Sequence, residues 1–374
     1  MIRLQGALPG RYTGAPPEEL ARWIGAAKAM LGDRVFILGH HYQRDEVMAW
    51  ADARGDSFGL SRMAAAKHDA EFIVFCGVHF MAESADILTG DHQQVLLPDL
   101  NAGCSMADMA DIDAVEEAWD ALAKVTDVEQ IVPITYMNSS AALKAFVGTH
   151  GGAVCTSSNA RAVLNWALDP AGTGRPAGDK GLFFPDQHLG RNTGYELGYG
   201  ASDMSVWNPR LVQGGLEDAE VKAATLLLWK GHCSVHQRFL PEHVDKVRAK
   251  YPGIQVIVHP ECRLEVCEKA DALGSTERLI KIVQDAPAGT SFAIGTEIHL
   301  VNRLAKQFAP LGKRIVTLDD TGCLCTTMYR ISPGHLAWAL ENLVEGRVVN
   351  RIQVRDDVKY WARVALDRML EVRA

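Results

Sequence analysis

Short, continuous runs of apolar and β-branched residues recur along the chain, and they constrain its fold more than any other sequence feature. The runs do not alternate with polar residues, as expected for strands that are buried on both faces of a sheet. Stretches with helical spacing separate them, which indicates an α/β protein with parallel sheets. The expected strands are residues 34–38, 72–76, 95–98, 131–135, 182–184, 255–258, 291–294 and 314–318, and the expected helices are residues 17–30, 108–123, 278–286, 335–343 and 356–370.

The length and the charge limit the classes of protein that fit. A chain of 374 residues suggests two or three domains, and three successive α/β units would fit. The formal net charge of -8 argues against a nucleic-acid-binding protein, which usually carries a basic face. No apolar run approaches the roughly 18 residues that span a bilayer, and the first residues lack the apolar core of a secretory signal. We therefore expect a cytoplasmic protein without a membrane partner.

Polar residues follow nearly every expected strand. Ligands of α/β proteins collect beyond the carboxyl ends of the strands, so these loops carry most of the functional information. Any single loop residue could merely cap its own loop, but the set as a whole favours a binding site. The loops read GHHYQ (39–43), GVH (77–79), DLNAGCS (99–105), YMNSS (136–140), TSSN (156–159), KGHCSVH (230–236), HPEC (259–262) and DTGCLC (320–325).

Eight cysteines are dispersed along the chain, and three of the polar loops contain them after a glycine or a Gly-His pair. Three thiolates from separate parts of the chain would suit a [4Fe–4S] cluster with one iron open to substrate. A structural zinc ion or unliganded core cysteines would explain the same residues. The chain has no G-x-G-x-x-G dinucleotide fingerprint, P-loop, H-E-x-x-H or C-x-x-C motif.

Ordered segments along almost the whole chain include GHHYQRDEV, LLPDLNAGCSMADM, YMNSSAALKA, FFPDQHLGRNTG, WKGHCSVHQRF, VIVHPECRLEV and CTTMYRI. Together they resemble the quinolinate synthase (NadA) family, in its longer form. The resemblance implies a transferase-type enzyme that condenses iminosuccinate with dihydroxyacetone phosphate. The product is quinolinate, formed with loss of phosphate and two waters in the ring-forming step of NAD biosynthesis. An aspartate oxidase or dehydrogenase would supply the iminosuccinate.

The resemblance also implies the architecture and the cofactor. The family fold has three α/β/α domains about a pseudo-threefold axis, with a [4Fe–4S] cluster held by one cysteine from each domain. The expected domains are residues 1–103 completed by the C-terminal helices in 326–374, residues 104–232 with an insertion, and residues 233–325. By motif the cluster ligands are Cys104, Cys233 and Cys325. Of the two neighbours Cys323 and Cys325, only Cys325 begins the family's C-x-x-M pattern.

The substrate-binding residues of the family can be carried over by motif. His40 and Tyr42 lie in its A-H-x-Y-Q loop, where Gly39 takes the alanine position. His41 and His79 receive no role. The other expected substrate-binding residues are Ser57, Tyr136, Asn138, Ser157, His236, His259, Glu261 and Thr276.

Four of these residues are expected to take part in catalysis. Glu261 of the H-P-E motif is the candidate general acid and base, because burial can tune a carboxylate. His259 would orient Glu261 or a substrate carboxylate. Tyr42 and Tyr136 would relay protons or hold intermediates. The open iron of the cluster would act as a Lewis acid in the dehydration steps.

Two other classes of protein share part of this pattern. A different iron–sulfur hydro-lyase would also have an open iron, but it should lack the H-P-E and Y-x-N loops. An electron-transfer module would need four cysteine ligands, usually in a compact run, and would have no use for a polar site.

Overall fold

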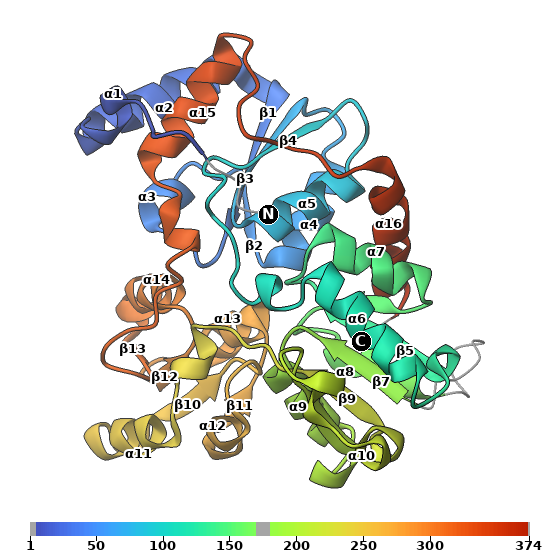
Figure 1. Ribbon diagram of the computed structural model, residues 1–374. Coiled ribbons are helices and arrows are strands. Elements are labelled where there is room, and N and C mark those ends of the chain that lie inside the picture. Colours follow the sequence, from blue (N-terminus) through green and yellow to red (C-terminus); the bar gives the residue numbers. More distant parts are fainter. Residues whose placement is uncertain (1–4, 170–179, 373–374) are drawn as a thin grey trace. The chain divides into compact units, whose positions relative to one another are not determined.

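The computed structural model describes residues 5–169 and 180–372, which form three β-sheets with helices between the strands (Figure 1). This arrangement confirms the expected α/β fold with mostly parallel sheets. The chain divides into two compact units. The first comprises Met1–Cys104, Ile298–Arg303 and Leu324–Arg355, and the second comprises Ser105–Glu297, Leu304–Cys323 and Asp356–Ala374. Within the described residues, no helix has both the length and the apolar character needed to cross a membrane.

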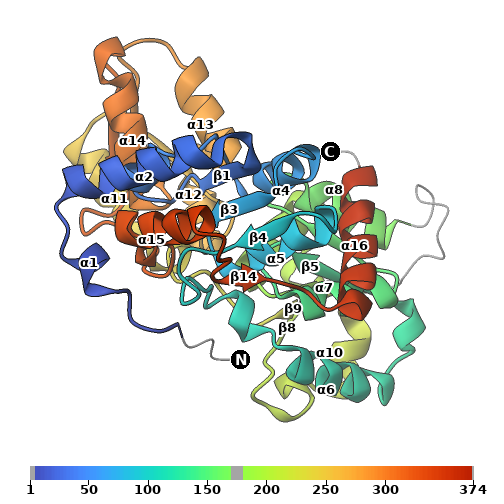
Figure 2. The same cartoon turned by 90° about the horizontal axis from the view of Figure 1, so that it is seen from above.

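The first unit is built on a sheet with the strand order β14-β4-β3-β1-β2. All neighbours pair in parallel except β14, which runs antiparallel to β4. Helices α2 and α15 lie side by side in this unit (Figures 1 and 2). The strands are β1 (Val35–His40), β2 (Ala53–Gly55), β3 (Phe72–Cys76), β4 (Gln94–Leu96) and β14 (Arg351–Ile352), and the helices are α1 (Gly10–Thr13), α2 (Pro17–Leu31), α3 (Asp45–Met48), α4 (Ser57–Ala66), α5 (His79–Leu88) and α15 (Pro333–Val344).

The second unit contains two fully parallel sheets, with the orders β6-β5-β7-β9-β8 and β11-β10-β12-β13. The strands of the first of these sheets are β5 (Ile131–Tyr136), β6 (Ala153–Cys155), β7 (Lys180–Phe184), β8 (Met204–Trp207) and β9 (Leu226–Trp229), with helices α6 (Ile112–Ala123), α7 (Ala141–Thr149), α8 (Ala160–Leu168), α9 (Gln187–Glu196) and α10 (Asp218–Ala223). The strands of the other are β10 (Gln255–Val258), β11 (Ala272–Leu273), β12 (Ser291–Gly295) and β13 (Arg314–Thr317), with helices α11 (Pro241–Lys250), α12 (Leu264–Lys269), α13 (Thr276–Asp285) and α14 (Ile298–Phe308), the last of which both units share.

The expected strands and helices all occur, with ends that differ by a few residues. The C-terminal segment is divided, because α15 packs on α2 whereas α16 (Asp356–Glu371) packs on α7 and β6 of the second unit. This packing of α16 differs from the expected completion of the first domain by both C-terminal helices, and the domain boundaries otherwise stay a prediction. Residues 172–179 of the expected insertion lie outside the described residues.

The carboxyl ends of the strands carry the polar loops, as parallel topology requires. His40 is the last residue of β1, and Tyr136 is the last residue of β5. His259 directly follows β10, and Thr296 directly follows β12. Each sheet therefore presents polar side chains at the carboxyl ends of its strands.

Helices α7 and α16 approach each other closely at Gly148 (Figure 1). A Cβ atom at this position would lie 2.0 Å from the carbonyl oxygen of Trp361, which is less than any real Cβ contact allows. The Arg368 side chain donates to the carbonyl of Gly148 at 3.2 Å and to that of Gly152 at 2.7 Å. Glycine is thus needed here for backbone approach rather than for its conformational freedom.

We expect Gly148→Ala to lower the free energy of unfolding by about 1–3 kcal/mol, because the added methyl group overpacks the contact with α16. A loss of stability would identify overpacking, because alanine ordinarily stabilises a helix interior by up to about 1 kcal/mol relative to glycine. Denaturant unfolding measures both effects. Gly25→Ala in α2 is the matched control, because its Cβ would make only ordinary contacts with Trp50, the nearest at 3.5 Å. Equal stability of the two variants would contradict the close packing.

Candidate functional site

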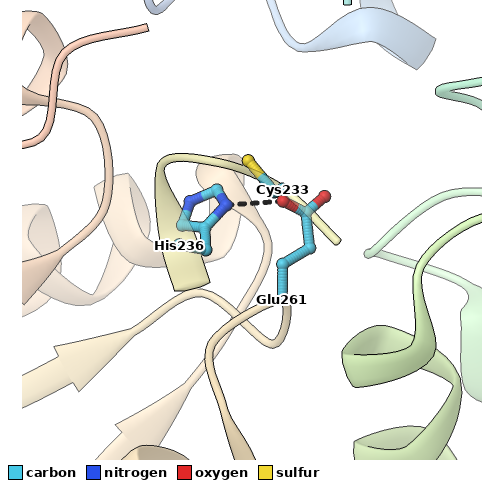
Figure 3. A group of neighbouring side chains, drawn as sticks. All are labelled: Cys233, His236 and Glu261. Carbon is cyan, nitrogen blue, oxygen red and sulfur yellow. Dashed lines mark hydrogen bonds and ion pairs between the residues drawn. The ribbon is translucent and has the colours of Figure 1, made fainter. Parts of the chain in front are cut away.

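A buried group of side chains surrounds the carboxylate of Glu261 in the second unit (Figure 3). Oε2 of Glu261 lies 2.5 Å from Nδ1 of His236, which begins the short helix η6 (His236–Arg238). The other ring nitrogen of His236, Nε2, lies 3.1 Å from Oγ1 of Thr296. Tyr136 also forms a side-chain hydrogen bond with Glu261. Tyr136 ends β5, and His236, Glu261 and Thr296 follow β9, β10 and β12, so the two sheets of the second unit meet at one carboxylate.

His259 completes this group. Its ring stacks on that of His236, with centroids 4.4 Å apart and an interplanar angle of 15°. Its Nδ1 accepts the backbone N–H of Glu261 at 3.3 Å, which places the ring proton on Nε2. The structure thus brings together four residues that the sequence nominated for the site: Tyr136, His236, His259 and Glu261.

The electrostatics of the group favour an ionised Glu261. Burial alone would raise the pKa of this carboxyl, but His236 and His259 and the hydrogen bonds from His236 and Tyr136 outweigh burial and lower the pKa to about 2. Burial lowers the pKa of His259 to about 3, so this imidazole is neutral at physiological pH. The site therefore holds a carboxylate that accepts hydrogen bonds within a water-poor environment.

Asp186 is a second buried carboxyl beside the group, and the sequence did not nominate it. Its Oδ1 caps α9 by accepting the backbone N–H groups of His188 at 2.7 Å and Leu189 at 3.1 Å. Burial, followed by the charge of Glu261, raises the pKa of Asp186, against an opposing hydrogen bond from the backbone of Cys233. Asp186 thus supports the loop that carries Cys233, and its burial beside Glu261 favours its protonated form.

Asn192 of α9 fixes the main chain on both sides of Glu261. Its side-chain amide donates to the carbonyl of Pro260 at 2.7 Å and to that of Cys262 at 2.9 Å. It also lies 3.3 Å from Sγ of Cys267. Because the two carbonyls flank Glu261, this one side chain limits rotation of the segment and so the direction of the carboxylate.

A comparable contact fixes the loop after β1 in the first unit. The guanidinium of Arg303 donates to the carbonyls of His41 at 2.8 Å and Gln43 at 2.6 Å, and to Oδ1 of Asp45 at 3.0 Å. These two carbonyls flank Tyr42. Arg303 therefore holds the backbone around a residue that the sequence nominated for the site.

The loop also fixes the ring of His40. The backbone N–H of Tyr42 donates to Nδ1 of His40 at 3.1 Å, and the two rings meet edge to face with centroids 4.9 Å apart. Because Nδ1 accepts this hydrogen bond, the neutral imidazole carries its proton on Nε2. His40 can thus donate a hydrogen bond to an anion without carrying a net charge.

The loop that carries Cys104 begins at the buried Asp99. Oδ1 of Asp99 accepts the backbone N–H of Asn101 at 2.9 Å and its side-chain amide at 3.0 Å. Oδ2 lies 3.5 Å from Nε of Arg330 and 3.7 Å from Nε2 of His335. The Asp99 carboxylate therefore joins this loop to the segment that follows the other nominated cysteine of the first unit.

The remaining nominated residues lie in loops or at the starts of helices. Ser57 and Thr276 are the first residues of α4 and α13, where backbone N–H groups attract anions. Asn138 and Ser157 lie in the loops after β5 and β6. Their convergence on one substrate stays a prediction. His79, which received no role, begins α5, and its Nδ1 lies 3.5 Å from Oε1 of Glu83.

The eight cysteines fall into two groups by exposure. Cys104, Cys233 and Cys325, the nominated ligands, are half-buried. The other five are buried, and burial raises the pKa of each thiol: Cys76, Cys155, Cys262, Cys267 and Cys323. Cys323 is 1% exposed with a pKa of about 11, so it differs clearly from Cys325 two residues away. Exposure thus selects the same three thiols as the sequence motifs.

Three side chains of the second unit form a group that could hold a metal ion. Donor atoms of Cys233, His236 and Glu261 all lie within 4.8 Å of one another (Figure 3). The donor chemistry also fits an iron–sulfur cluster, because clusters take cysteine thiolates and three accessible cysteines are present.

Comparison with known proteins identifies the family. A family model described as "Quinolinate synthetase A protein" matches residues 24–371. The curated quinolinate synthase of Acidobacterium capsulatum is 64% identical over 363 residues, which cover 97% of this chain and 95% of that protein. The chain belongs to the quinolinate synthase family. The quinolinate synthases of Corynebacterium glutamicum and Geobacillus kaustophilus are 56% and 52% identical, over 98% of this chain and 91% and 96% of theirs.

Sequence reasoning about this quinolinate synthase family member missed Thr296, Asp186, Asn192 and Arg303. Thr296 directly follows β12, so the same strand-end criterion that selected the other loops could have found it. Asn192 and Arg303 lie within helices, where spacing gives no sign that a polar side chain reaches a distant main chain.

We expect iodoacetamide at pH 8 to alkylate Cys104, Cys233 and Cys325 well before the five buried cysteines in the cluster-free chain. The thiolate is the reactive form, and a thiol with a pKa of about 11 is ionised only to about one part in a thousand at that pH. Peptide mass spectrometry at short times measures the order. Cys323 and Cys325 form an internal comparison, and faster modification of Cys323 would contradict the distinction between them.

Proposed function

We propose that this chain is a quinolinate synthase that condenses iminosuccinate with dihydroxyacetone phosphate and releases phosphate and two waters. Its membership of the family supports the reaction. The observation that carries the proposal is the position of Cys233, a nominated cluster ligand, beside Glu261 and His236, with donor atoms within 4.8 Å. A reaction that moves protons and eliminates water needs acid–base groups next to its electrophilic centre.

Cys104, Cys233 and Cys325 would hold a [4Fe–4S] cluster, and their half-buried thiols fit that role. When bound, the cluster supplies an open iron that polarises a substrate oxygen and eases the loss of hydroxide. The five buried thiols have raised pKa values and are poor candidates for thiolate ligands.

Both substrates are anionic, so the site must bind negative charge. Neutral donors supply this binding: the Nε2–H of His40, and the backbone N–H groups at the starts of α4 and α13 beside Ser57 and Thr276. Asn138 and Ser157 would add side-chain donors. Such donors recognise carboxylate and phosphate without a cluster of basic residues.

Proton transfer would use the hydrogen-bonded series from Tyr136 through Glu261 and His236 to Thr296. Glu261 is ionised and can accept a proton from substrate carbon, while its hydrogen bonds to Tyr136 and His236 give that proton a route onward. His259 is neutral and packs against His236, so it orients the pair without adding charge. Tyr42, whose two neighbouring backbone carbonyls accept hydrogen bonds from Arg303, would also relay protons.

The proposed setting follows from the substrates. Iminosuccinate hydrolyses readily as an imine, so an enzyme that oxidises aspartate, an oxidase or a dehydrogenase, would supply it directly. We place the reaction in the cytoplasm, where thiolates stay reduced.

We expect the full-length chain, reconstituted anaerobically with iron and sulfide, to bind about four iron ions and to form quinolinate from the two substrates. Replacement of Cys104, Cys233 or Cys325 by serine should remove both the broad visible absorption and the activity. Cys323→Ser is the matched control and should keep both. Iron analysis, absorption spectra and an anaerobic assay for quinolinate provide the measurements.

The outcomes of this experiment separate the possible classes. A different hydro-lyase would bind the cluster but form no quinolinate. An electron-transfer module would form no quinolinate and would also lose its cluster on removal of a fourth cysteine. Loss of the cluster in Cys323→Ser but not in Cys325→Ser would overturn the ligand assignment.

We expect Glu261→Gln to reduce kcat by about 10²–10⁴-fold, because the amide keeps the volume but cannot take up a proton. The visible absorption of the reconstituted protein should stay unchanged, which separates catalysis from cluster binding. Glu265→Gln is the control, since Glu265 is exposed on α12 and should leave kcat unaltered. Full turnover by Glu261→Gln with an intact cluster would show that another group moves the proton.

A further inference from the structure

We propose that, in the chain without a cluster, Cys233, His236 and Glu261 bind a single divalent transition-metal ion of the Zn²⁺ type. All three residues belong to the second unit, and their donor atoms lie within 4.8 Å of one another. Bonds of about 2.0–2.3 Å in a tetrahedral zinc site place the ligand atoms roughly 3.3–3.8 Å apart. Coordination of one ion therefore requires the 2.5 Å between Nδ1 of His236 and Oε2 of Glu261 to widen, and the longest separation to shorten, each by about 1 Å.

The orientation of His236 suits a metal ligand. Its Nδ1 points at the carboxylate of Glu261 (Figure 3). Its Nε2 lies 3.1 Å from Oγ1 of Thr296. Metal-bound histidines usually donate the second ring N–H to an oxygen, which fixes the tautomer. Thr296, fully buried, already supplies that oxygen. A bound ion would take the place of the proton between Nδ1 of His236 and Oε2 of Glu261.

The donor types and their burial indicate the class of ion. One thiolate, one imidazole and one carboxylate suit Zn²⁺, Co²⁺ or Fe²⁺, whereas Mg²⁺ and Ca²⁺ prefer sets of oxygen ligands. His236 and Glu261 are buried, and Cys233 is half-buried, so the thiol forms the accessible side of the site. Water would complete a four-coordinate ion from that side.

This site differs from the cluster site in its ligands. It uses one of the three nominated cysteines and neither Cys104 nor Cys325, which belong to the first unit. Cys233 cannot ligate an isolated ion and a cluster together, so the isolated ion belongs to the cluster-free chain. The proposal rests on the geometry of three side chains and does not depend on the proposed reaction.

Cobalt binding to the reduced, EDTA-treated full-length chain under anaerobic conditions tests the proposal. We expect one Co²⁺ per chain, a thiolate-to-cobalt charge-transfer band in the near ultraviolet, and displacement of the cobalt by Zn²⁺. Cys233→Ser should remove the band. Cys104→Ser and Cys325→Ser should keep both the band and the dissociation constant.

The remaining ligands are tested by affinity. We expect His236→Ala and Glu261→Gln each to raise the Kd for Co²⁺ by at least about 10–100-fold, and Thr296→Val by about tenfold with the charge-transfer band retained. Circular dichroism checks the fold of each variant, and the Glu261 variant carries the test should Cys233→Ser fail to fold.

Two results would overturn the proposal: loss of the band in Cys104→Ser or Cys325→Ser, or an unaltered Kd in both the His236 and Glu261 variants. Quinolinate formation is measured separately on cluster-loaded protein. An active enzyme without cobalt binding would therefore remove this proposal alone, and cobalt binding without activity would remove only the proposed function.

Discussion

The hydrogen bond between Glu261 and His236 is the interaction on which the rest of the site depends. A buried carboxylate is costly unless its oxygens are satisfied and a compensating partner lies nearby. Tyr136 and His236 form hydrogen bonds with this carboxylate, and Thr296 forms one with Nε2 of His236. Each of these four residues sits at or after the end of a different strand of the second unit. The positions of four strand ends are therefore linked through one buried charge.

Two polar side chains hold the main chain around two proposed catalytic residues in the same way. Asn192 donates to the two carbonyls that flank Glu261, and Arg303 donates to the two carbonyls that flank Tyr42. In both cases a polar side chain on a helix binds the backbone on both sides of the residue rather than its side chain. The backbone of the residue is thereby fixed without use of the side chain proposed for catalysis. A loop held in this way positions its side chains almost as rigidly as a helix does.

The sequence predicted most of the fold, because continuous apolar runs and helical spacing are local signals that burial in a parallel sheet preserves. The motifs of the family that the chain resembles also nominated Tyr136, His236, His259 and Glu261, all of which lie in the polar loops of the sequence. The lowered pKa of Glu261 was not predictable, since burial alone would have raised it and only the positions of its neighbours decide the direction.

Other features depend on tertiary packing and leave no local sign in the sequence. The contacts of Asn192 and Arg303 link residues 68 or more positions apart. The packing of α16 on α7 depends on the absence of a side chain at Gly148. The chain has 33 glycines, and the sequence does not indicate which of them allows a close helix contact. The motif distinguished Cys323 from Cys325, but only the fold shows the physical difference between them, since Cys323 is buried and Cys325 is half-buried.

The reach of Asn192 has a consequence for how the site forms during folding. Helix α9 packs on β7 and β9 of one sheet. The side-chain amide of Asn192 on this helix nevertheless binds the loop that follows β10 of the other sheet. Neither sheet can set the direction of Glu261 by itself, so the geometry of the site is established only after the two have docked. Local opening of α9 would release the loop while both sheets stay folded. The geometry of the site therefore depends on the cooperative folding of the whole second unit. It can be lost while every strand stays folded.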